Sequence, residues 1–96
     1  MAVVWGPKDP EAIRDYGNDW TADLGVKTIT GSTWLLDGVA WSGGPLVKVA
    51  SSFTTTNTTV RISGGTVGQS YIVTNHIVMS DGEEDDWSQK LKIKER

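Results

Sequence analysis

The sequence predicts an all-β fold, and three features carry that prediction. Thr, Val, Ile and Trp, which are favoured in strands, are abundant. Eleven glycines divide the 96 residues into short pieces. These pieces have strand-like rather than helical patterning. Segments of this number and spacing are typical of an immunoglobulin-like β-sandwich of about seven strands, here with an extended N-terminal arm in front.

Residues 1–14 are expected to form the arm and residues 15–96 the sandwich domain. Within the arm, Asp9 has the residue type of a helix cap and Pro10 that of a first helical position. One short helical turn is therefore predicted before the first strand. Apolar residues precede this turn, and we expect them to contact a neighbouring subunit: Val3, Val4 and Trp5.

Seven segments of the domain are predicted to be strands, with turn residues between them. Two of the separators, Asp37-Gly38 and Asp81-Gly82, are dipeptides that favour tight hairpin turns. The predicted strands are 16–20, 28–35, 39–41, 46–51, 58–62, 71–79 and 87–94.

The last two predicted strands differ in pattern. Strand 87–94 alternates apolar and lysine residues, as a half-buried edge strand does. Strand 71–79 is apolar on both faces, which is typical of a central or covered strand. Ile72 and Val78 lie on its second face, and we expect another protein chain to cover them.

A glycine-rich connection precedes the sixth predicted strand. Gly64, Gly65 and Gly68 indicate a turn that needs positive φ or a close backbone approach. Tyr71 follows at the head of the strand, where a tyrosine-corner residue is found in immunoglobulin-like domains. Its ring is expected in the core and its hydroxyl on an upstream backbone group.

Five tryptophans are many for this length. Trp20, Trp34 and Trp87 fall within or at the start of predicted strands, which favours core or sheet-packing positions. Tyr16 shares a strand face with Trp20. Trp5 and Trp41 lie beside glycines in short or irregular segments and are expected to be exposed interface residues. Exposed tryptophans could instead stack on sugars, so a carbohydrate-binding module is an alternative.

The run Asp81-Gly82-Glu83-Glu84-Asp85-Asp86 concentrates carboxylates near a predicted hairpin tip. Its spacing does not match an EF-hand loop, so no metal site is predicted, and a solvated tip is the simpler interpretation. A cation site and a contact with a basic partner stay open as alternatives. The weak candidates for metal ligands are Asp81, Glu83, Asp85 and Asp86.

Composition argues against several classes of function. The chain has no cysteine for a disulfide or a thiolate metal site, and nine scattered basic residues with a net charge of −3 provide no nucleic-acid footprint. No apolar run approaches the roughly 20 residues of a membrane helix. His76 is the only histidine and no nucleophile motif surrounds it, so we predict no enzyme activity, no catalytic residue and no cofactor.

Three segments stand out by their order and spacing. They are Asp9-Pro10 with residues 15–20 (DYGNDW), residues 28–34 (TITGSTW) and residues 62–75 (ISGGTVGQSYIVTN). Together they resemble a family of small tailed-bacteriophage virion proteins, the fiber–tail adaptor or virion-associated proteins. Relatives are expected to carry a basic residue after the Ser80-Asp81-Gly82 turn, whereas Glu83 follows here, which is consistent with a different docking partner.

The resemblance implies a phage virion structural protein, an adaptor that joins tail and fiber or neighbouring virion proteins by protein–protein contacts. It implies many copies per particle, assembly in the bacterial host cytoplasm, and no direct contact with membrane or nucleic acid. A capsid decoration or cement protein is an alternative that the resemblance leaves open.

Overall fold

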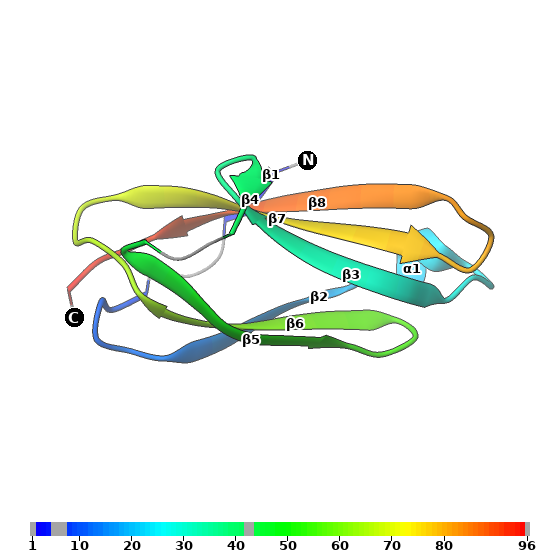
Figure 1. Cartoon of the computed structure of the whole chain (residues 1–96), viewed down its shortest axis with the longest axis horizontal. Coiled ribbons are helices and arrows are strands. Elements are labelled where there is room, and N and C mark those ends of the chain that lie inside the picture. Colours follow the sequence, from blue (N-terminus) through cyan, green and yellow to red (C-terminus); the bar gives the residue numbers. More distant parts are fainter. Residues whose placement is uncertain (1, 5–7, 42–43, 96) are drawn as a thin grey trace.

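The computed structural model describes residues 2–4, 8–41 and 44–95 of the chain. Its strands form two sheets that lie face to face (Figure 1). The molecule is elongated, with principal extents of 41 × 23 × 19 Å. The predicted all-β sandwich is therefore confirmed. Among the described residues, no helix is long and apolar enough to cross a membrane.

The larger sheet has five strands in the order β1-β8-β7-β3-β4. β1 runs parallel to β8, and the other neighbours are antiparallel. β7 is thus a central strand, as its apolar pattern predicted. The bounds are β1 (Ala2–Val4), β3 (Ile29–Leu36), β4 (Val39–Ala40), β7 (Ser70–Met79) and β8 (Glu84–Lys92).

The smaller sheet is antiparallel, with the order β2-β6-β5. β5 carries an irregularity between Lys48 and Ala50, where the register against β6 shifts. These strands are β2 (Arg14–Asp19), β5 (Leu46–Phe53) and β6 (Asn57–Gly64). The order of strands in both sheets is compatible with an immunoglobulin-like fold, and that finer assignment stays a prediction.

The core between the sheets consists of two clusters. One contains Trp34, which is 1% exposed and surrounded by aliphatic side chains from both sheets. The other contains Trp20, also 1% exposed, together with Ile77 and Met79 of β7. Trp87 packs against this second cluster, with its ring edge-to-face on Trp20 at 5.3 Å between centroids. Trp20 and Trp34 thus lie in the core, and Trp87 packs against it, as predicted for all three.

All seven predicted strands are present, with ends shifted by a few residues. The helical turn predicted near Asp9 is not formed as a helix. Asp9 does accept from the backbone of Glu11 at 2.8 Å and of Ala12 at 3.0 Å, but the chain then extends into β2. The one described helix is instead α1 (Thr21–Leu24), a single turn between β2 and β3.

The described residues of the amino-terminal arm pair with the chain's own sandwich, whereas the arm was expected to extend to a neighbouring subunit. β8 was predicted to be an edge strand, but β1 pairs with it at Ser88–Lys90, so β8 has a neighbour on both sides along that stretch. Lys8 is fully buried and forms an isolated bridge with Ile93. Pairing of β1 provides backbone hydrogen bonds that β8 would otherwise leave open to solvent.

Lys8 is held where the arm meets the sandwich. Its backbone N–H donates to Lys92 O at 2.9 Å, and its carbonyl accepts from the Lys94 N–H at 2.9 Å. The Nζ group donates to Asp9 O at 2.9 Å and to Gly64 O at 2.6 Å. Burial lowers the pKa of Lys8, because desolvation disfavours the charged form.

The glycine-rich corner lies between β6 and β7. Gly64 has φ +75°, and a Cβ there would stand 2.3 Å from Pro45 O. Gly65 has φ +107°, and a Cβ there would stand 2.6 Å from the side chain of Ile93. Both expected reasons for glycine, positive φ and close approach, therefore hold. Gly68 is also at positive φ, +86°.

Tyr71 packs against the first core cluster, and its hydroxyl oxygen accepts from the Thr66 N–H at 3.3 Å. The expected bond to an upstream backbone group is thus present. We predict that Tyr71→Phe, which keeps the ring, lowers the free energy of unfolding by about 1 kcal/mol. Tyr71→Ala should cost about 3 kcal/mol, because it removes the ring as well. Urea denaturation of both variants measures this, and equal, near-zero losses would rule out a corner role.

Candidate functional site

The candidate interaction surface is the outer face of the five-stranded sheet, the side turned away from β2, β5 and β6. On β7, Ile72, Thr74, His76 and Val78 occupy alternate positions between the buried ones, so they point outward. Ile72 is 38% exposed and Val78 is half-buried beside Gly31 of β3. The two β7 residues predicted to face a partner therefore lie on one face.

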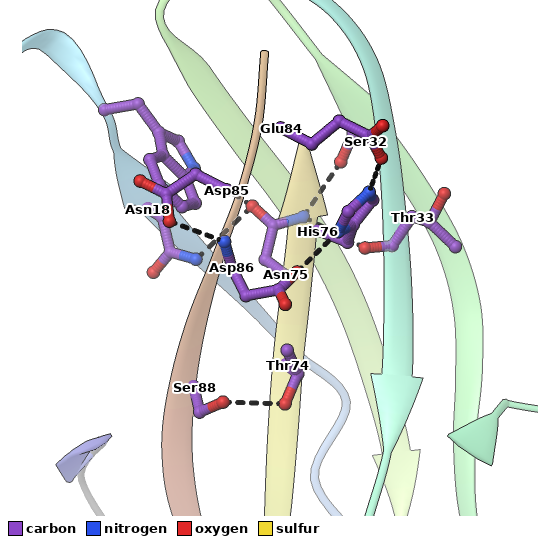
Figure 2. A network of polar contacts seen from close by, with 11 residues as sticks. Asn18, Ser32, Thr33, Thr74, Asn75, His76, Glu84, Asp85, Asp86 and Ser88 are labelled. Atoms are coloured by element: carbon purple, nitrogen blue, oxygen red, sulfur yellow. Dashed lines mark hydrogen bonds and ion pairs between the residues drawn. The ribbon is translucent and has the colours of Figure 1, made fainter. Parts of the chain in front are cut away.

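His76 stands at the centre of a charged group on this outer face (Figure 2). It is paired with Asp86 in the register of β7 and β8. Its Nδ1 lies 2.5 Å from Asp86 Oδ1, and its Nε2 lies 2.6 Å from Glu84 Oε1. Hydrogen bonds that the ring donates to the carboxylate of Asp86, and then to that of Glu84, raise the pKa of His76 above 6.5.

A raised histidine pKa makes stability depend on pH. The imidazolium is favoured in the folded chain, so its contribution is complete below pH 6.5 and is lost as pH rises through the higher folded pKa. The side chain is 31% exposed, so we expect a loss of less than about 1 kcal/mol. Urea denaturation across this range should show the decline in the native chain and not in His76→Gln. A histidine that titrates at or below 6.5 by NMR would contradict the prediction.

The acidic run divides between two cations instead of converging on one point. Lys27 pairs with Asp81 at 3.0 Å and also with Glu83. Hydrogen bonds to Glu83 and Asp81 raise the pKa of Lys27. The pKa of Asp81 is lowered, first by the hydrogen bond from the Glu83 N–H and next by the one from Lys27. Glu84 and Asp86 face His76. β8 begins at Glu84, so half of this run is strand and not hairpin tip.

The candidate metal ligands are thus spread along the turn and the first residues of β8. In the described part of the chain, no group of three or more His, Asp or Glu side chains is arranged to hold a metal ion. Asp85 accepts from the Asp86 N–H at 2.8 Å and is the one acidic side chain of the run that faces neither Lys27 nor His76.

A buried polar network links the sheets beneath the outer face, and its centre is Asn75 of β7. Asn75 Oδ1 accepts from Trp20 Nε1 at 3.0 Å and from Thr58 Oγ1 at 2.6 Å. Its Nδ2 donates to Ser32 Oγ at 3.0 Å and to Thr33 O at 3.2 Å (Figure 2). A single side chain on one sheet therefore contacts β6 of the other sheet and the neighbouring strand β3.

Two further amides extend this network across the sandwich. Asn18 of β2 is 5% exposed, and its Nδ2 lies 3.5 Å from Asn75 Oδ1. Gln89 of β8 is 1% exposed, and its Nε2 donates to Asn18 Oδ1. The sequence interpretation did not single out these residues. The signal was available, because Asn75 takes an inward position between Val73 and Ile77, where apolar residues are expected.

The predicted interface tryptophans have different outcomes. Trp41 was expected to be exposed but is half-buried: it packs against the first core cluster and its Nε1 donates to Leu46 O at 2.9 Å. Trp5 lies outside the described residues. Val3 and Val4 belong to β1 by their backbone pairing with Gln89 and Lys90. Tyr16 is half-buried and also packs against the first core cluster.

Comparison with protein families gives one match. Residues 8–92 match a family model described as Podophage GP4 fiber-tail adaptor protein gp77. Among curated proteins, none is similar enough in sequence to match the chain. The matched range begins at Lys8, the residue at which the arm meets the sandwich, and extends to the last residue of β8.

Proposed function

The chain belongs to the podophage fiber-tail adaptor family, and from this premise we propose that the outer face of its five-stranded sheet is a contact surface of the adaptor. The family is one of virion structural proteins that bind other virion proteins such as tail and fiber. A protein of this kind needs surfaces that other chains cover. We propose further that the chain acts by binding alone, in many copies per particle, and is assembled in the host cytoplasm.

The observation that carries the proposal is the apolar end of the outer face. Ile72 exposes 38% of its surface on a central strand. In a monomer, a buried or polar side chain at this position would avoid the cost of apolar surface in contact with water. Thr33 of β3 is paired with His76, so its side chain lies on the outer face. Leu35, two residues further along β3, lies on the same face and is half-buried. The surface thus combines apolar side chains with the His76 charged group, as the core and rim of a protein interface do.

The outer face is a better candidate than the amino-terminal arm. The arm was expected to reach a neighbour, yet its backbone pairs with β8 and Lys8 is buried within the chain's own sandwich. Sugar binding has no comparable support, because Trp41 is half-buried and its indole N–H already donates to Leu46 O. The family description names tail and fiber, which favours that location over the capsid surface.

The test is incorporation into phage particles. Ile72→Glu places a carboxylate on the proposed surface without touching the core, and Val26→Glu is the matched control, since Val26 is 100% exposed outside the sheets. Ile72→Glu should fold normally and lower the amount of this chain, and of fibers, in purified particles. Val26→Glu should be incorporated as the native chain is. Normal incorporation of Ile72→Glu would rule out the outer face as a contact surface.

A further inference from the structure

A pocket lies where α1 meets the first residues of β8, apart from the apolar end of the outer face. Its volume is about 270 Å³, and its lining residues are Trp20, Asp23, Asp85, Asp86 and Trp87. This is just below the range of pockets for small organic ligands, so it suits one side chain better than a large ligand.

Two indole rings form the inner wall of the pocket. Trp20 and Trp87 meet at an interplanar angle of 86° with centroids 5.3 Å apart. Trp20 is 1% exposed, so the half-buried Trp87 presents more of the aromatic surface. Asp85 takes the position two residues before Trp87 on the same side of β8. The carboxylate and the ring therefore border the same space.

The charge of the pocket is not neutralised within the described residues. Some acidic side chains elsewhere have cationic partners: Asp15 pairs with Arg61 at 2.8 Å, and Asp81 with Lys27 at 3.0 Å. Asp86 directs its carboxylate to His76 on the outer face. In the part of the chain that the structure describes, neither Asp23 nor Asp85 has an ion-pair partner.

The strand edge beside the pocket has no partner among the described residues from Glu84 to Asp86. β1 pairs with β8 from Ser88 to Lys90, and no described strand continues this pairing toward Glu84. Because no described residue pairs with Glu84–Asp86 on that side, this part of the backbone can accept an added strand from another chain.

We propose that this pocket receives an arginine side chain from an extended segment of a partner virion protein, which adds to the open edge of β8. A guanidinium ion suits the site, because it binds carboxylates through paired N–H donors and also stacks on indole rings. The partner's identity as a virion protein rests on the proposed function; the arginine site rests on the pocket alone.

The experiment titrates the isolated chain with Nα-acetyl-arginine amide and follows the indole N–H signals by NMR. The matched probe is the citrulline analogue, which has nearly the same shape and no charge. Arginine amide should shift the signals of Trp87 and Trp20, and the citrulline analogue should not at equal concentration. The double variant Asp23→Asn/Asp85→Asn should weaken binding at least about tenfold, because both charge-assisted contacts are lost.

Asp15→Asn is the control variant, since it removes one carboxylate far from the pocket, on β2. It should keep the native affinity, and a second removal of charge by Glu11→Gln, at an exposed position before β2, matches the double variant in net charge. Equal shifts with both probes, full binding by the double variant, or stronger binding of neutral sugars would overturn the proposal. Because this titration needs no particle, its failure is separate from the result for Ile72→Glu.

Discussion

Asn75→Leu is expected to lower the free energy of unfolding by roughly 3 to 5 kcal/mol. Leucine has a similar size but cannot accept from Trp20 Nε1 and Thr58 Oγ1, which lie 3.0 and 2.6 Å from Asn75 Oδ1. It also leaves Ser32 Oγ and Thr33 O without the donor that Asn75 Nδ2 provides. Trp20 and Thr58 are buried between the sheets, so their two donor groups cannot regain these bonds from water without local opening.

Urea denaturation at fixed pH measures the loss, and Asn57→Leu is the control. Asn57 is exposed at the start of β6, so its replacement should change stability by no more than about 0.5 kcal/mol. A loss below about 1 kcal/mol for Asn75→Leu would mean that the gain in apolar burial offsets the broken network, as happens at some buried polar sites. The network would then serve to fix how the sheets align and would add little to stability.

Deletion of residues 1–8 is expected to lower the free energy of unfolding by roughly 3 to 5 kcal/mol, although the arm was expected to serve contacts with a neighbouring subunit. It removes the pairing of β1 with β8 and the four hydrogen bonds of Lys8 to Asp9, Gly64, Lys92 and Lys94. The corner carbonyl of Gly64 would lose its Nζ donor, and Lys92 O its backbone donor.

Two smaller changes separate the parts of this effect. Deletion of residues 1–4 removes β1 alone and should cost less than the full deletion. Lys8→Ala in the full chain keeps the backbone bonds at Lys92 and Lys94 and removes only the Nζ bonds. Thermal unfolding of the three variants should give the largest loss for the full deletion. If the full deletion left stability unchanged, the arm would be independent of the sandwich after all.

The class of fold could be predicted because it depends on local patterns. Alternation along β8, the apolar faces of β7 and the Asp37-Gly38 turn each specify a strand or a reversal within a few residues. The same holds for the glycine corner, where positive φ at Gly64 and Gly65 restricts which residues the backbone tolerates. The two-sheet sandwich follows from summing these local preferences.

The pairing of the arm could not be predicted in the same way. Val3 and Val4 were interpreted as interface residues because nothing local shows which strand they would join. β1 is parallel to β8, and the two strands are separated by most of the chain, so their register depends on contacts formed only after folding. Lys8 is similar, since its hydrogen bonds join it to two distant segments, the corner at Gly64 and the chain around Lys92 and Lys94.

The sequence by itself determined the strands, the turns, the glycine corner and the burial of Trp20 and Trp34, because hydrophobic alternation and backbone sterics act between near neighbours. Only the tertiary structure decided the Asn75 network, the division of the acidic run between Lys27 and His76, and the pocket beside Trp87. Each of these requires side chains from different sheets or strands to meet. Their distances depend on how the strands are ordered and aligned, which local patterns leave open.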